Sequence, residues 1–102
     1  MKNRGRFYNA SQFLSGYFHL DWKDDFDEPE EAVAQFIKDS DRQMRADALD
    51  DLRQIVAEFH GPDLNRVMLE IDCYYSPERY RGVPMREWLN QVIMELENSI
   101  SH

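Results

Sequence analysis

This 102-residue sequence is poor in several residue types, and each shortage excludes a class of protein. Its one Cys excludes an internal disulfide and a four-cysteine zinc site. It has four Gly and no glycine-rich phosphate loop, and no G-x-S-x-G or H-E-x-x-H motif indicates a hydrolase. No apolar run approaches the roughly 20 residues that span a bilayer, and the basic start lacks the apolar region of a signal peptide. We therefore expect a cytoplasmic protein without a membrane segment.

Basic residues are also few, because 12 Lys and Arg stand against 20 Asp and Glu, for a formal charge of −8. This balance argues against direct nucleic-acid binding and against docking on anionic lipid, which both need cations, and it favours a basic partner. A hydrophobic content of 42% supplies enough apolar surface for folding. The length fits a single domain over residues 1–102, with 1–8 and 99–102 expected to be flexible. The oligomeric state stays open.

Apolar residues recur at helical spacing, and strand alternation is sustained nowhere, which predicts an all-α fold of about five helices. The expected helices begin near Asn9 or Ser11, at Pro29, at about Asp41, at Pro62 and at Pro84. The helix from Asp41 to about His60 has the clearest pattern, and Gly61-Pro62 ends it. Its predicted apolar stripe consists of Met44, Ala48, Leu52, Ile55, Val56 and Phe59. The last helix is expected to end near Asn98, and residues 21–28 and 74–83 to be irregular.

Carboxylates concentrate in residues 21–31, called here the acidic segment. It holds seven carboxylates and one Lys, a local charge of −6, whereas the other residues total −2. One interpretation places the carboxylates of 27–31 at the positive start of a helix, which leaves Asp21, Asp24 and Asp25 unexplained. A calcium loop would need a central Gly and a Glu at its twelfth position, and neither fits. The other interpretation is a surface that presents Asp24, Asp25, Asp27, Glu28, Glu30 and Glu31 to a cationic partner.

The remaining candidates for chemistry are one Cys and three His. Cys73 ends an apolar stripe, where a thiol is usually an inert part of the core. His60 suits the end of a helix, His102 is a chain end, and His19 has no second ligand at metal-site spacing, which favours a structural role. We therefore expect no catalytic residue, no metal site and no cofactor. The alternative is a metal-binding or acid–base enzyme that uses the clustered carboxylates.

Three short motifs point to a family. Tyr17-Phe18-His19-Leu20-Asp21-Trp22 follows the first expected helix, and Tyr74-Tyr75-Ser76-Pro77 precedes Arg86-Glu87-Trp88-Leu89. From about residue 13 to residue 96 the chain resembles the immunity proteins of bacterial contact-dependent growth inhibition systems. This resemblance implies a small, acidic, all-helical cytoplasmic protein that is not an enzyme. It also implies binding to the C-terminal toxin domain delivered by a neighbouring cell, whose active site it blocks. Leu20 departs from the family pattern, which has a polar residue there.

The charges and aromatic rings of these motifs allow a structural hypothesis. Asp21 follows one expected helix and Arg86 opens another, so we expect a charge-assisted Asp21–Arg86 pair covered by Trp22 and Trp88. Breaking such a partly buried pair costs about 3–5 kcal/mol.

The tyrosines of the 74–83 loop suggest an interface. Tyr74, Tyr75 and Tyr80 stand beside Arg79 and Arg81, and both residue types are enriched where proteins meet. The leading prediction is therefore an immunity protein whose acidic segment and tyrosines bind a basic toxin domain, expected to be a nuclease. A nucleic-acid-mimicking regulator is a further alternative that uses the same acidic surface.

Overall fold

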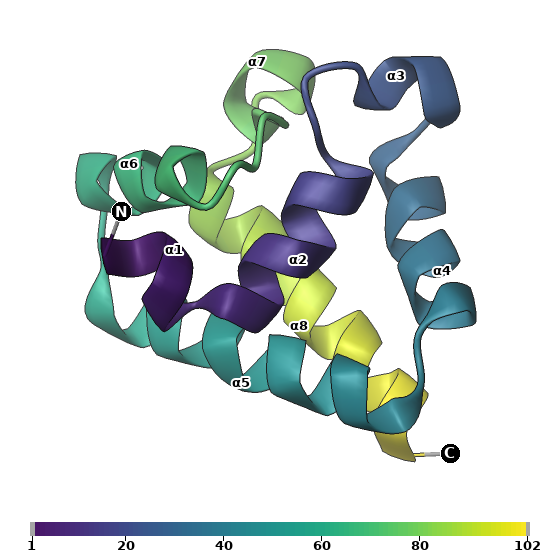
Figure 1. Cartoon of the computed structure of the whole chain (residues 1–102). Helices are drawn as coiled ribbons and strands as arrows, with labels where there is room; N and C mark the ends of the chain where they lie inside the picture. The colour runs from purple at the N-terminus through teal and green to yellow at the C-terminus, as the bar shows by residue number, and fades with distance from the viewer. Residues whose placement is uncertain (1, 102) are drawn as a thin grey trace.

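The computed structural model describes residues 2–101, and Figure 1 shows an all-helical arrangement, which confirms the predicted fold class. Met1 and His102 lie outside the described residues, so the expectation of flexible chain ends is not tested at these two positions. In chain order the helices are α1 (Lys2–Arg6), α2 (Tyr8–Tyr17), α3 (Trp22–Asp25), α4 (Pro29–Asp39), α5 (Arg42–Glu58), α6 (Pro62–Glu70), α7 (Pro77–Arg81) and α8 (Met85–Ser101).

The predicted number of about five helices is wrong, because residues 2–101 form eight. The additional helices are α1, α3 and α7, which have only four or five residues each. A helix of one turn is too short to repeat an apolar residue at helical spacing, so periodicity cannot detect it. α7 does have local signals, because the Ser76 side chain caps it and Pro77 is its first residue.

The core lies between α5, α8 and α2. The α5–α8 contact is the most extensive pairing of helices, and α2 packs on α5. In Figure 1, α4 flanks this core on one side and α6 on the other, with α3 and α7 above them. Residues 2–6, which we expected to be flexible, form α1 against α6, and Phe7 is fully buried behind them. The Arg6 guanidinium also donates to the Glu58 carboxylate at 2.6 Å.

The predicted stripe of α5 is partly wrong. Asp41 caps the helix as expected, since its carboxylate accepts the Met44 amide at 2.8 Å. The Met44 side chain, however, is 51% exposed, whereas Leu49, which the stripe omitted, is 5% exposed. α2 and α8 cover two sides of α5, so its buried face is wider than a single stripe and includes Leu49. α8 continues past Asn98 to Ser101, three residues beyond the expected end.

Two helix starts receive their caps from other helices. Asp51 of α5 accepts the backbone amides of Asn9 and Ala10, at 3.0 and 3.1 Å, in the first turn of α2. Glu78 of α7 accepts the amide of Met85, the first residue of α8, at 2.8 Å. The first amides of a helix have no partner within it, so these carboxylates satisfy donors that would otherwise be left open. Both contacts fix the placement of neighbouring helices.

The end of α6 requires a left-handed residue. Asp72 has φ of 66°, a conformation that places Cβ close to the next carbonyl in residues other than Gly. The Cys73 amide donates to the Met68 carbonyl at 2.9 Å and the Asp72 amide to the Leu69 carbonyl at 3.0 Å. This pair of hydrogen bonds is a Schellman motif, in which Gly is the usual left-handed residue.

Replacing Asp72 tests this strain. Both Asp72→Gly and Asp72→Ala lose the ion pair with Arg4, but only Ala keeps the steric penalty of positive φ. We therefore expect Asp72→Gly to be more stable than Asp72→Ala by about 1 kcal/mol, measured by urea unfolding at pH 7. Equal stabilities would show that the turn relaxes to another conformation.

Candidate functional site

The three motifs meet in one group of rings, called here the aromatic cluster and made of Phe18, Trp22, Tyr75, Tyr80 and Trp88. The Tyr75 ring lies 4.8 Å from Trp88, 5.2 Å from Trp22 and 5.5 Å from Phe18, measured between centroids. Tyr80 adds edge contacts to Trp22 and Tyr75 at 5.5 and 5.8 Å. Aromatic pairs in such geometries contribute about 0.5–1.5 kcal/mol each beyond their burial. The cluster thus connects α2, α3, α7 and α8.

The predicted Asp21–Arg86 pair is wrong. No hydrogen bond or ion pair joins the two side chains anywhere in residues 2–101, and Asp21 is exposed. Arg86 instead donates to the Phe59 carbonyl at 2.7 Å and lies 2.8 Å from Nδ1 of His60. A guanidinium placed at the last carbonyls of α5 satisfies acceptors that the helix leaves open. Trp22 and Trp88 are buried as expected, but they pack against other aromatic rings and do not cover the predicted ion pair.

His19 orders the start of the acidic segment. Its Nδ1 accepts the Asp21 amide at 3.1 Å, which assigns the proton to Nε2, and Nε2 lies 2.8 Å from the Asp25 carboxylate. Both ring nitrogens therefore have partners within α3 and the turn before it. This geometry matches the structural role predicted for His19.

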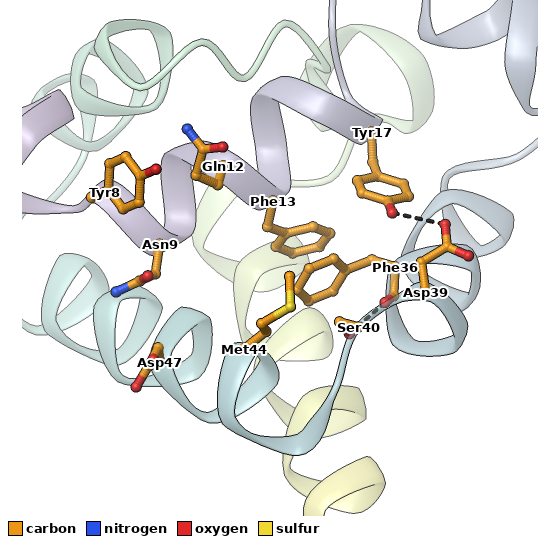
Figure 2. Close-up of a pocket in the computed structure, with 10 residues that line it drawn as sticks. All are labelled: Tyr8, Asn9, Gln12, Phe13, Tyr17, Phe36, Asp39, Ser40, Met44 and Asp47. Atoms are coloured by element: carbon orange, nitrogen blue, oxygen red, sulfur yellow. Dashed lines mark hydrogen bonds between the residues drawn. The ribbon is translucent and has the colours of Figure 1, made fainter.

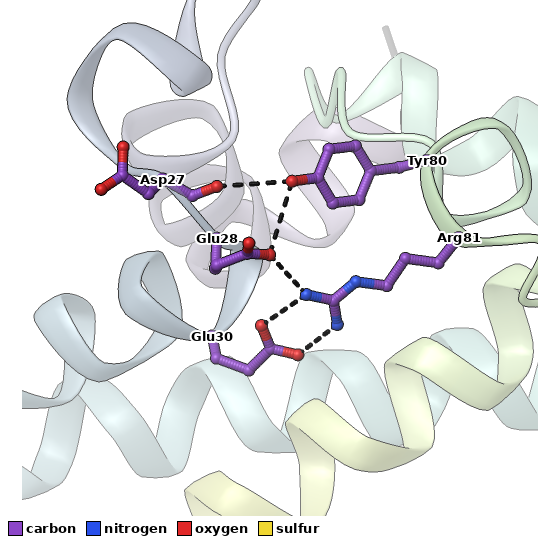
Figure 3. Close-up of polar contacts among 5 residues, drawn as sticks. All are labelled: Asp27, Glu28, Glu30, Tyr80 and Arg81. Atoms are coloured by element: carbon purple, nitrogen blue, oxygen red, sulfur yellow. Dashed lines mark hydrogen bonds and ion pairs between the residues drawn. The ribbon is translucent and has the colours of Figure 1, made fainter.

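Arg81 and Tyr80 of α7 hold the other end of the acidic segment (Figure 3). The Arg81 guanidinium binds the Glu28 carboxylate at 2.7 Å and both oxygens of Glu30, the second at 2.9 Å. The Tyr80 hydroxyl donates to the Asp27 carbonyl at 3.3 Å or to Glu28 at 3.4 Å. The hydrogen bonds from Arg81 lower the pKa of Glu30. These contacts fix the first turn of α4 against α7.

The remaining carboxylates of the acidic segment point away from such partners. Among the residues that the structure describes, the carboxylates of Asp21, Asp24, Asp27 and Glu31 have no ion pair and no hydrogen bond. Asp24 and Asp27 lie on α3 and in the loop after it, and Glu31 lies in the first turn of α4. The structure therefore divides the segment into bound carboxylates that shape it and free carboxylates that face solvent.

The three candidate tyrosines lie in different environments. Tyr74 is 47% exposed, whereas Tyr75 is only 2% exposed and belongs to the aromatic cluster. A side chain this buried offers almost no surface to a partner, so its assignment as a direct contact does not fit the structure. Leu20 and Leu69, which are not among the predicted contact residues, are 77% and 57% exposed beside Tyr74. Leu20 stands where the resemblance led us to expect a polar side chain.

A pocket lies between α2, α4 and α5 (Figure 2). It encloses about 340 Å³, and the rings of Phe13 and Phe36 stack at 4.1 Å in its floor. The Tyr17 hydroxyl donates to Asp39 at 2.8 Å along one side, and Met44 lies on the opposite rim. Burial, aided by that hydrogen bond, raises the pKa of Tyr17 to about 12, so the phenol stays protonated at neutral pH.

Groups capable of other chemistry have ordinary structural roles. Burial raises the pKa of the Cys73 thiol to about 12, so a nucleophilic thiolate does not form near neutral pH, and the thiol packs in the core. Among residues 2–101, no group of three or more His, Cys, Asp or Glu is placed to hold a metal ion. None of the helices described here is both long and apolar enough to cross a bilayer.

Comparison with known families shows to which family the chain belongs. A family described as CdiI immunity protein matches residues 6–96, which is most of the chain. The chain belongs to this family. Membership confirms the resemblance drawn from the three motifs and makes the chain a toxin-neutralising immunity protein with a cognate toxin as its partner. No curated protein and no solved structure matches it.

In this CdiI immunity protein, Arg81 provides a test of how the acidic segment is held. We expect Arg81→Gln to lower the melting temperature, and the loss to be greater at low salt than at 1 M salt, because screening weakens ion pairs. Arg79→Gln is the matched control, since Arg79 lies on the same short helix without a carboxylate partner among residues 2–101.

The stability difference between the wild type and Arg81→Gln should also depend on pH. Because Arg81 lowers the pKa of Glu30 in the folded state, the stability that it adds is present above the ordinary value of 4.5. This contribution is lost as the pH falls through the lowered pKa. The wild type and Arg81→Gln should therefore converge in melting temperature below pH 4.5, and a constant difference down to pH 2.5 would contradict the assignment.

The buried Tyr75 hydroxyl gives another prediction. It finds no hydrogen-bond partner among the groups of residues 2–101, so Tyr75→Phe should leave the free energy of unfolding within about 0.5 kcal/mol of the wild type or raise it. Tyr75→Leu should destabilise clearly, because it removes the central ring of the aromatic cluster. Urea unfolding followed by tryptophan fluorescence measures both, and a loss above 1 kcal/mol in Tyr75→Phe would show that the hydroxyl is bonded.

Proposed function

We propose that this chain neutralises a nucleic-acid-cleaving toxin domain by placing its acidic segment over the basic active site of that domain. The observation that carries the proposal is the concentration of charge, −6 within residues 21–31 of a chain with net charge −8. The free carboxylates of Asp21, Asp24, Asp27 and Glu31 supply the unpaired part of this charge. α7 and the aromatic cluster hold the segment in one geometry, which reduces the entropy lost on binding.

The chemistry of nucleases explains why such a surface would inhibit one. A nuclease binds the phosphate backbone with Lys and Arg, so its cleft attracts a closely spaced row of carboxylates. Long-range attraction steers the two proteins together and raises the association rate, while the bulk of α3 and α4 excludes substrate from the cleft. Binding alone accounts for this inhibition, without catalysis or a cofactor. Because the substrate of such a toxin is inside the cell, the encounter would take place in the cytoplasm.

Charge reversal tests this surface with a matched control. Asp24→Lys and Asp50→Lys change the net charge equally, and both residues are exposed without an ion-pair partner among residues 2–101, but only Asp24 lies in the acidic segment. We expect Asp24→Lys to slow association with the cognate toxin domain by about tenfold at low salt and to flatten its salt dependence. Asp50→Lys should have a much smaller effect. Stopped-flow measurements with the cognate toxin domain give both rates.

The same toxin domain tests the chemistry assigned to the partner. On its own it should cleave DNA or RNA, and an equimolar amount of this chain should stop the cleavage. Equal association rates for the two variants would remove the acidic segment from the interface. A toxin domain that leaves both nucleic acids intact would instead remove the nuclease assignment, while its binding to this chain could still be measured.

A further inference from the structure

An exposed apolar groove adjoins the acidic segment and is called here the Leu20 groove. Its rim carries Leu20, Leu69 and Tyr74, which are 77%, 57% and 47% exposed, and it encloses about 380 Å³. These are three of the six large apolar side chains that are exposed among residues 2–101. Scattered exposed apolar residues are common, but a contiguous group around a concave surface marks an interaction site in soluble proteins.

The floor of the groove is rigid. Met68 and Cys73 are 0% and 2% exposed, and Tyr75 beneath them is the centre of the aromatic cluster. The Tyr74 amide donates to the Phe18 carbonyl at 2.8 Å, which fixes the rim against the end of α2. A partner side chain that enters therefore meets a preformed apolar floor, which is the usual environment of the few residues that carry most of an interface's affinity. Polar groups complete the lining, from Asn65, Ser76, Glu78 and Arg79.

The position of the groove identifies its occupant. Leu20 directly precedes Asp21, and Trp22 of the acidic segment packs on the Tyr75 ring at 5.2 Å, so groove and acidic segment are neighbouring parts of one surface. A second copy of this chain would bring another segment of charge −6 against the first, and like charges oppose that contact. The charge complement is a basic protein that also presents an apolar side chain.

Resting on the proposed function, we propose that the Leu20 groove anchors the cognate toxin domain by receiving an aliphatic or aromatic side chain flanked by Lys or Arg. The two parts of the surface then have different effects on binding. The free carboxylates raise the association rate through long-range attraction, whereas the groove slows dissociation through short-range contact. Apolar contact is not screened by salt, so its contribution persists at high ionic strength.

The double variant Leu20→Ser/Leu69→Ser tests this division, with Met94→Ser as the control. Met94 is 61% exposed on α8 and does not line the groove, so its substitution removes exposed apolar surface away from the groove. Binding to the cognate toxin domain is measured by surface plasmon resonance at low and high salt. We expect the double variant to dissociate at least tenfold faster at both salt concentrations, with its association rate within about twofold of the wild type. Met94→Ser should match the wild type in both rates.

Each other outcome overturns the proposal in a distinguishable way. Tight binding by the wild type with unchanged dissociation of the double variant would reject the groove as an anchor and leave the proposed function intact. No binding by the wild type would reject both. A wild-type dimer in sedimentation equilibrium that the double variant dissociates would assign the groove to a second copy of this chain. Melting curves establish that both variants fold, which their exposed positions favour.

Discussion

The packing of Tyr75 against Trp22, Trp88 and Phe18 is the contact on which the rest of the structure depends. These rings belong to segments far apart in the sequence, and their centroids lie within 5.5 Å of Tyr75. Phe18 directly follows α2, Trp22 begins α3 and Trp88 lies in α8, so one group of side chains fixes three helices relative to each other. The acidic segment starts within this group, and its position follows from that of Trp22.

Charged side chains also constrain how the helices are placed, because several of them cap the ends of other helices. Asp51 caps the start of α2, Glu78 the start of α8, and Arg86 the end of α5. Each of these contacts joins two helices as well as satisfying open backbone groups. Arg81 acts in the same way on the acidic segment, binding Glu28 and Glu30 while other carboxylates stay free. A strongly acidic chain thus folds with part of its charge serving internal contacts.

How far the sequence predicted these features depended on whether a signal was local. Periodicity and caps located the five longer helices, including the start of α5 at Asp41, because both signals lie within the helix itself. Composition located the acidic segment in the same way. The partner of Arg86 could not be predicted, because the choice between Asp21 and the Phe59 carbonyl depends on distances set by the whole fold. The burial of Tyr75 beside an exposed Tyr74 depends on the same distances.

Buried and exposed side chains lie close together along these short segments, so one surface can serve both folding and recognition. Tyr75 and Trp22 point into the aromatic cluster, whereas their neighbours Tyr74 and Asp24 face solvent. A substitution at an outward position leaves the ring contacts in place, so the surface can change without loss of the fold. The motifs contain both inward and outward residues, such as Tyr75 and Tyr74, and Leu20 is the most exposed of the large apolar side chains described. Inward residues that hold the fold and outward residues of the proposed binding surface therefore alternate along the same short segments.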